Sequence, residues 1–565
     1  IDALPARSLN ELLSHVSGVD IRQRGPFGAQ ADISIDGGSF EQTLILVNGI
    51  KVLDAQTGHN GLNLPIPTDA IERIEIIRGP AARIYGINSL TGAINIVTKK
   101  PSGSGLSAHA YTGSGFKRDT ANNDALFNGR GIQLGATVTG RAGSHSLYGG
   151  HESGNGYRYN TAFRNNKVFY QGEIPTSGAD VVSLMGGYVS NGFGANGFYA
   201  APGDKESREV VQTVLAAIGY KGQLTEKLSL SPRVSYRYGY DDYRYFRHDL
   251  SRARSQHHSH SVNTEVNATL QTGAGDIGVG VEMRNEIIRS SNIGNHNRNN
   301  YGLYAEFKTE KIKRLLLSAG AYVNYNSDYG WQVFPGIDVG YALSEQWKLV
   351  AHTGMGQRIP SFTDLYLDQR PGNIGNPLLQ SEHAWHAEGG IKYTDHRTVA
   401  HAGYFYRNMD NFIDWVRLSL DEPWQPYNFQ QHRTQGLAFS GNYRLFAGQQ
   451  KTTWMVGVGY TWLAPRFDDS HNAGFLSKYV IESLRHQATA NIHFSSGRFS
   501  ATAAARFNER ISYKSYFLGD VRIGYRLNAL DLYMDVQNIF DTTYIEAAAV
   551  PMPGRWFSLG LKYGI

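Results

Sequence analysis

One short stretch of the sequence, residues 54–63 (DAQTGHNGLN), gathers side chains that can hold a large neutral ligand. It combines amide, hydroxyl and imidazole groups with glycines and little charge: Gln56, Thr57, His59, Asn60 and Asn63. Amides donate and accept hydrogen bonds, whereas a strongly anionic ferric chelate favours clustered arginine or lysine. We therefore predict that these five residues bind a bulky, amide-rich ligand, although asparagine and glycine are also ordinary turn formers.

Two further loops rich in glycine are expected at the same end of the molecule. They span residues 25–28 and 85–91, and they separate segments with the composition of strands. Loops that meet at one end of a rigid scaffold are common places for ligand binding. The loops therefore add Phe27, Ile87 and Asn88 to the predicted ligand-binding residues.

No metal or catalytic site stands out from the sequence. His258 and His260 share one face of a predicted strand and so could chelate, but a solvated rim or aromatic-like packing at a bilayer interface explains them better. The chain has no cysteine, which excludes disulfides and thiolate metal sites. We find no nucleophile beside a base and no pair of acid–base carboxylates. The prediction is therefore a protein without enzymatic activity, bound metal or cofactor.

The composition narrows the class of protein. The 565 residues include 64 glycines and 34 tyrosines, and the net charge of +5 is too small to indicate nucleic-acid binding. No segment approaches the ~18 consecutive apolar residues of a membrane-spanning helix. If the chain crosses a membrane, it must therefore do so with strands.

From residue 104 onward the sequence alternates polar and apolar residues over segments of about ten residues. In the segment 261–271, for example, Val262, Val266 and Leu270 oppose Asn263 and Glu265. Soluble β-sandwiches show the same alternation, but its repetition along the chain, with tyrosines near strand ends, is typical of a transmembrane barrel with a polar lumen. We predict an all-β barrel of about 22 antiparallel strands.

The connections between these strands alternate in length. A short one at 343–346 contrasts with long polar segments at 241–259, 288–300, 357–381 and 407–434. Short turns on one side and long loops on the other are typical of outer-membrane barrels. Tyr243 and Tyr245 lie in the first long segment, so they are expected beyond the membrane, in contact with ligand or with a covering protein.

The first hundred residues have a different texture and predict a small mixed α/β domain. Ser8 and Glu11 form a capping box that starts a helix, and Gly18 ends it. Strands are predicted at 32–35, 43–47, 73–77 and 93–98. We place the domain boundary so that residues 1–103 form this domain and residues 104–565 form the barrel.

Charges of both signs occur on one predicted strand and just after it. They are Glu72, Arg73, Glu75, Arg78 and Arg83. A domain held inside a polar lumen would meet inward-facing polar side chains, so we predict that these five residues pair across the interface with the barrel. The alternative is that they are ordinary solvated charges on a surface strand.

Several motifs resemble those of the TonB-dependent outer-membrane transporters, and the resemblance covers essentially the whole chain. The N-terminal motifs are LSHVSGVDIRQRG, TLILVNGIKV and IERIEIIRGPAARIYGINSLTGAINIVTKK; the later ones are GQRIPSFTDLY, GNPLLQSEH and DVQNIFDTTY. Two positions depart from the usual pattern: Asp36 stands where the family commonly has arginine, and the last residue is Ile565 rather than an aromatic.

This resemblance implies a location, an energy source and partners. The N-terminal domain would be a plug inside the lumen of a barrel in the outer membrane, surrounded by its lipids and lipopolysaccharide. TonB would pull on the plug from below with energy from the inner membrane. Some members of the family work beneath a surface lipoprotein that acts as a lid, and the long loops leave room for one.

The segments GPFGAQADISIDGGSF and TGHNGLNLPIP look most like the cobalamin transporters of the family. Cobalamin is therefore the expected transported ligand, with haem or a ferric siderophore as the alternative. Haem transporters tend to carry a histidine between two of the later landmarks; this chain has none there, although His59 or His383 could serve. A passive porin and a surface adhesin are the alternatives from other classes.

Overall fold

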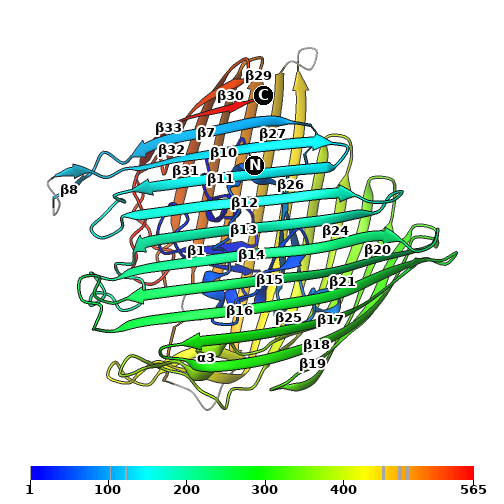
Figure 1. Cartoon of the computed structure of the whole chain (residues 1–565), viewed down its shortest axis with the longest axis horizontal. Coiled ribbons are helices and arrows are strands. Elements are labelled where there is room, and N and C mark those ends of the chain that lie inside the picture. Colours follow the sequence, from blue (N-terminus) through cyan, green and yellow to red (C-terminus); the bar gives the residue numbers. More distant parts are fainter. Residues whose placement is uncertain (1, 102, 121–123, 448–451, 469–473, 479–482) are drawn as a thin grey trace.

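The computed structural model describes residues 2–101, 103–120, 124–447, 452–468, 474–478 and 483–565. It is a closed antiparallel barrel of 22 long strands with the N-terminal domain inside it. In Figure 1 that domain, coloured dark blue, lies behind the front wall of the barrel. The predicted fold class is therefore confirmed.

Strands of up to 23 residues form the wall, and the last pairs with the first, so this sheet has no open edge. Closure of this kind satisfies every backbone group inside a bilayer. The strands are β7 (Gly105–Ser114), β10 (Gly129–Gly140), β11 (Gly143–Gly154), β12 (Phe163–Pro175), β13 (Val181–Gly194), β14 (Arg208–Gln223), β15 (Leu228–Arg244), β16 (Arg254–Gln271), β17 (Asp276–Ser290), β18 (Gly294–Thr309), β19 (Leu315–Asn326), β20 (Gly330–Ala342), β21 (Trp347–Arg358), β24 (Glu382–Thr394), β25 (Thr398–Arg417), β26 (Gln425–Ala447), β27 (Thr452–Asp468), β29 (Leu484–Ser496), β30 (Phe499–Arg510), β31 (Tyr516–Leu527), β32 (Leu530–Gln537) and β33 (Trp556–Gly564).

The two faces of each strand meet different surroundings. On β16, Val262 is 41% exposed on the outer face, whereas Asn263 and Glu265 are only 5% and 7% exposed on the inner face. The predicted alternation is therefore apolar toward the lipid and polar toward the lumen. In the described ranges, no helix is both long and apolar enough to span a bilayer.

The lengths of the connections distinguish the two ends of the barrel. Short turns such as 141–142, 343–346 and 528–529 mark the periplasmic end, and long loops such as 195–207, 359–381 and 538–555 mark the extracellular end. Some loops carry short elements: β8 (Arg118–Asp119), β9 (Ala125–Leu126), α3 (Phe362–Tyr366), β22 (Asp368–Gln369), β23 (Asn373–Ile374) and β28 (Leu476–Ser477).

Three of the four predicted long connections were wrong in extent. The segments 241–259, 288–300 and 407–434 consist largely of strand, with loops only at 245–253, 291–293 and 418–424. Beyond the bilayer the outer face of a strand meets polar surroundings, while the inner face packs in apolar clusters, as Ile288, Met409 and Trp415 do. The alternation of the membrane part therefore ends while the backbone ladder continues. The fourth prediction, 357–381, matches the loop 359–381 closely.

The inner domain is a four-stranded sheet in the order β4-β3-β6-β5, beside a hairpin of β1 and β2. Its elements are α1 (Leu9–Leu13), β1 (Val19–Gln23), β2 (Ala31–Ile35), η1 (Phe40–Gln42), β3 (Thr43–Val47), β4 (Ile50–Lys51), η2 (Gly58–Asn60), η3 (Thr68–Ala70), β5 (Ile71–Arg78), α2 (Ala82–Tyr85) and β6 (Gly92–Thr98). The four predicted strands are present. The helix begins as predicted, with Ser8 accepting from the Glu11 backbone N–H, but it ends before Gly18.

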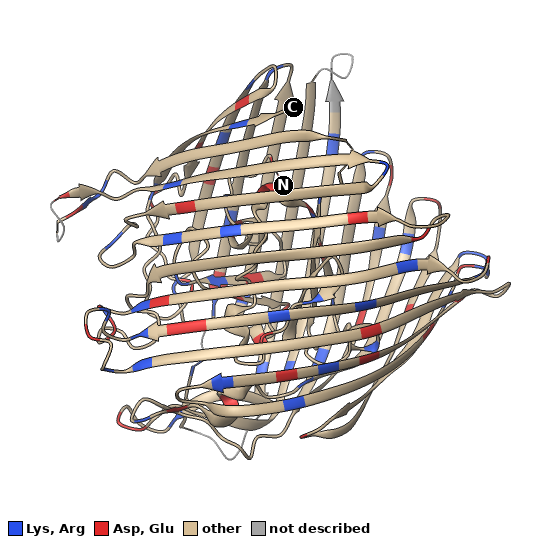
Figure 2. Ribbon diagram, in the orientation of Figure 1, with Lys and Arg blue, Asp and Glu red and all other residues tan. Residues whose placement is uncertain are grey.

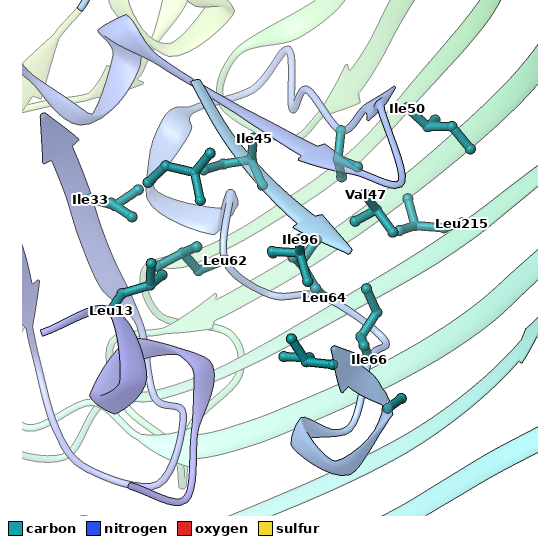
Figure 3. Packing of buried hydrophobic residues seen from close by; sticks show 14 of the residues in the cluster. Leu13, Ile33, Ile45, Val47, Ile50, Leu62, Leu64, Ile66, Ile96 and Leu215 are labelled. Atoms are coloured by element: carbon teal, nitrogen blue, oxygen red, sulfur yellow. The ribbon is translucent and has the colours of Figure 1, made fainter. Parts of the chain in front are cut away.

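The core of the plug extends into the barrel wall. Buried aliphatic residues of β2, β3 and β6 meet the loop that carries Leu62, Leu64 and Ile66. Leu215 of β14 joins the same cluster from the wall, as Figure 3 shows. The plug is therefore seated against the barrel by apolar contact as well as by polar pairs.

Candidate functional site: the covered apex of the plug

The predicted ligand-binding residues lie at the extracellular end of the plug, and most of them are buried. Phe27, Gln56, Thr57, Asn60 and Ile87 are each between 3% and 7% exposed. A ligand that arrives from outside therefore cannot reach them in this conformation. The apex of the plug is a covered site.

The amide side chains of the apex hold the plug to the wall. Gln56 Nε2 donates to Asp241 Oδ2 at 2.8 Å, and Asn60 Nδ2 lies 3.5 Å from the same oxygen. Asn63 Nδ2 donates to Thr213 Oγ1 at 3.1 Å. The residues with the predicted chemistry thus bind the lumen face of β14 and β15 while the site is covered.

His59 is fixed within the plug. Its Nδ1 pairs with Asp32 Oδ1 at 2.5 Å, and its ring stacks on Phe40 with centroids 4.1 Å apart. Thr57 caps the short turn η2, which contains His59, by accepting from the His59 backbone N–H. Burial lowers the pKa of His59, and the neighbouring Asp32 opposes this effect. The second histidine considered for haem, His383, is exposed and contacts Ser381 at 3.2 Å.

The extracellular loop 359–381 covers one side of the apex. The backbone N–H groups of Phe362 and Thr363 donate to the carbonyls of Ala55 and Gln56, both at 3.1 Å. Ser361 caps the helix α3 that presents these groups. In the sequence this segment was noticed only as a family motif. The capping box at its start could have shown that a structured loop begins there.

Apolar clusters close the cover on both sides. Ala55 is buried with Phe362 and Trp415 beneath the loop 359–381. Across the apex, Phe27 stacks on Phe163 at 4.5 Å and meets Trp556 edge-on at 5.2 Å. Aromatic contacts of this kind contribute about 0.5–1.5 kcal/mol each beyond the area that they bury. The apex of the plug is therefore held on both sides by apolar as well as polar contacts.

The two predicted tyrosines differ in their surroundings. Tyr243 is half-buried and packs against the cluster around Phe27, with its ring edge-on to Tyr199 at 5.0 Å. Tyr245 lies in the loop 245–253 and contacts Phe246 at 4.8 Å. Tyr243 thus belongs to the cover, whereas Tyr245 stands outside it.

The third apical loop contacts β21. The Asn88 backbone N–H donates to the Gln357 carbonyl at 2.9 Å, and Asn88 Oδ1 accepts from the Ile359 N–H at 3.2 Å. Ile87 is buried with Tyr322 and Phe334 of the wall. These contacts tie the start of the loop 359–381 to the plug.

Among the predicted interface charges, Arg83 has partners on the barrel. Its guanidinium pairs with Asp338, lies 3.7 Å from Glu306 and donates to Ser318 Oγ at 3.3 Å. Arg78 pairs within the plug instead, 3.7 Å from Asp36. The Asp36 carboxylate thus pairs with an arginine of the plug. The Asp36 backbone carbonyl accepts a hydrogen bond from Arg407 of β25.

The prediction of barrel partners is thus wrong for Arg78, and it is also wrong for Glu72, Arg73 and Glu75. Arg73 binds Glu72 at 2.9 Å and Glu75 at 2.8 Å, and its side chain is 53% exposed. These residues form a solvated pair network on β5, because that face of the strand meets open space rather than the wall. The alternative interpretation, ordinary solvated charges, describes them correctly.

A carboxylate beneath the cover gives the apex a dependence on pH. Glu41 Oε1 accepts from the Gly58 N–H at 2.8 Å, and burial raises the pKa of Glu41 to about 7, with Arg358 opposing. Between the ordinary pKa of 4.5 and this value, only the folded apex holds the proton. Glu41 therefore stabilises the apex below pH 4.5, and this contribution is lost as the pH rises through 7.

We expect Glu41→Gln to remove this dependence, because the amide stays neutral. Between pH 5 and 8 the wild type should lose roughly 2–3 kcal/mol of local stability relative to the variant. Amide hydrogen exchange in residues 54–63 measures this local opening. The exposed Glu72→Gln variant serves as the control, and equal pH profiles for wild type and Glu41→Gln would contradict the assignment.

Comparison with known proteins agrees with this architecture. Residues 1–93 match the model of the TonB-dependent receptor plug domain, and residues 101–539 match that of the TonB-dependent receptor-like β-barrel. The vitamin B12 transporters BtuB of Photobacterium profundum and Vibrio vulnificus are each 24% identical to this chain. The matches cover 96% of this chain in both cases, and 88% and 87% of the relatives.

Solved structures show the same fold. The siderophore receptor PirA from Pseudomonas aeruginosa aligns with a TM-score of 0.75 and 19% identity, over 99% of this chain and 96% of that one. The ferric enterobactin receptor PfeA in complex with BCV-L6 aligns with a TM-score of 0.79 and 18% identity, over 99% and 97%. With both family models matched along most of its length, the chain belongs to the TonB-dependent receptors, transporters of the outer membrane.

Proposed function

We propose that this receptor imports a bulky ligand without strong net charge, most consistent with cobalamin or a related corrinoid, across the outer membrane. TonB, the partner that the family implies, would supply the force. The ligand would bind at the covered apex after the extracellular loops open.

The charge balance at the apex is the observation that supports this choice of ligand. Arg24 pairs with Asp32 at 2.9 Å, and Arg237 pairs with Asp54 at 2.9 Å. Arg358, the last residue of β21 before the covering loop, lies between Glu382 and Asp364. Each of these cations already has a carboxylate partner, so a highly anionic ferric chelate would have to compete with it.

The neutral groups at the apex support the same ligand. Gln56, Asn60 and Asn63 now bind the wall, and they can exchange these contacts for hydrogen bonds with ligand amides. The aromatic cover adds apolar surface that large organic ligands favour. The full-length likeness to two vitamin B12 transporters points in the same direction.

Binding to the detergent-purified protein tests the proposal. Cyanocobalamin, haemin and ferric enterobactin are titrated separately, with tryptophan fluorescence or calorimetry as the readout. We expect cyanocobalamin to bind at least ~100-fold more tightly than the other two, a difference of about 2.7 kcal/mol. Tight binding of haemin or ferric enterobactin alone would replace cobalamin by that ligand and leave the transporter architecture unchanged.

A further inference from the structure

The outer surface of the barrel carries a row of arginines at its extracellular end. Arg208 of β14 lies directly opposite Arg244 of β15, and Arg244 lies directly opposite Arg254 of β16. Arg164 of β12 is exposed and close enough to act electrostatically on Arg208. Figure 2 shows basic residues at the left-hand ends of the neighbouring strands β14, β15 and β16. We call these four residues the arginine cluster.

The arginine cluster is not neutralised by the protein. Like charges directly opposite each other destabilise a sheet. The Asp242 carboxylate pairs with both Arg244 and Arg254, with Nε–O distances of 2.9 and 2.7 Å. Asp242 is almost fully buried. In the part of the chain that the structure describes, Arg164 and Arg208 have no ion pair or side-chain hydrogen bond. Four positive charges thus share one carboxylate.

The position of the cluster indicates which anion it meets. Below Arg208, the outer face of β14 continues with Val210, Val214 and Ile218, and Ile218 is 53% exposed toward the lipid. On the neighbouring strand, Tyr238 bonds His258 Nδ1 at 2.8 Å. Tyrosines and histidines at this level form an aromatic girdle, which marks the membrane interface. The arginine cluster lies just beyond the girdle, at the level of the outer-leaflet headgroups.

We propose that the arginine cluster binds a phosphate group of an acylated lipid of the outer leaflet. Guanidinium groups bind phosphate oxygens in bidentate geometry, and a dianion among four arginines would remove their mutual repulsion. The acyl chains of the same lipid would lie along the apolar outer face of β14. This second contact favours a lipid over free phosphate, and the site is independent of the imported ligand.

Native mass spectrometry with lipid A, the phosphorylated and multiply acylated glucosamine lipid, tests the proposal. The variant Arg164→Gln/Arg208→Gln is chosen because neither residue has an ion pair in the described structure, so the fold should be retained. We expect diphosphorylated lipid A to bind the wild type and to bind the variant roughly tenfold more weakly. Lys221→Gln, on the same strand at its other end, should bind as the wild type does.

Two further arms identify the anion and its source. Lipid A without phosphate groups should bind weakly to the wild type and the variant alike, and inorganic phosphate should not displace diphosphorylated lipid A. Equal binding of diphosphorylated lipid A to wild type and variant would overturn the site. Displacement by inorganic phosphate at equal concentration would show a free-anion site and would overturn the lipid as its occupant. Heat-modifiable migration on gels verifies that each variant is folded.

Discussion

Deletion of residues 2–100 is expected to convert the receptor into an open pore. The wall closes through its own backbone ladder, β33 against β7, so the barrel does not need the plug to complete its sheet. The plug occupies the lumen through apolar contacts such as Leu215 and polar pairs such as Arg83 with Asp338. A barrel of 22 strands without its plug leaves an aqueous channel.

Liposome swelling with small sugars measures this change. Flux through the intact receptor should stay at background, and flux through the deletion variant should rise by at least roughly tenfold. The variant Glu72→Gln, in which an exposed plug charge is removed, should remain closed. Sugar flux through the intact protein would restore the passive-porin interpretation, and a closed deletion variant would show that the extracellular loops alone can block the lumen.

The membrane part of the fold was predictable because two solvents act on one strand. Lipid outside and polar groups inside impose a period of two, which the alternation of Val262 and Asn263 records in the sequence. Where a strand leaves the bilayer, as at Tyr243 and Arg244, its outer face becomes polar and its inner face packs against aromatic residues, so the pattern ends before the strand does. The extent of the loops therefore could not be predicted.

Strand β1 (Val19–Gln23) was not among the predicted strands, and its polar residues explain why. Its residues are all buried, yet Asp20 and Arg22 alternate with apolar ones because the strand faces the polar lumen. Asp20 binds Arg510 of β30 at 2.6 and 2.7 Å. A polar residue in a plug strand therefore indicates contact with the barrel wall as readily as exposure to water.

The place of residues 54–63 in the fold was predictable, but their contacts were not, and their binding of a ligand remains a prediction. The composition of residues 54–63 indicated an apex with neutral hydrogen-bonding groups, and the structure places them at the extracellular end of the plug. Their partners, Asp241 and Thr213, come from strands far away in the sequence, as does the cover at Phe362. Such long-range contacts leave no local pattern. For the same reason the sequence did not distinguish Arg83, which pairs with the barrel, from Arg73, which does not.

The covered apex predicts that a disulfide across the cover will block ligand entry. The backbone hydrogen bond from Thr363 to Gln56, 3.1 Å long, brings the backbones of the loop 359–381 and the plug side by side, and close backbones are the first requirement of a disulfide. In the variant Gln56→Cys/Thr363→Cys, oxidation should hold the loop in its covered position. Because the 565 residues include no cysteine, the two introduced residues can form only this one disulfide within the molecule.

Binding of cyanocobalamin, or of whichever ligand the titration identifies, should then fall at least ~100-fold in the oxidised variant, since the open state is no longer populated. Reduction of the same protein should restore it. The single variant Gln56→Cys measures what loss of the hydrogen bond to Asp241 does alone, and Thr363→Cys controls for the loop. If the oxidised variant binds as the reduced one does, the ligand must enter past Phe27 and Trp556 instead, and the cover over Ala55 is a fixed part of the receptor rather than a gate.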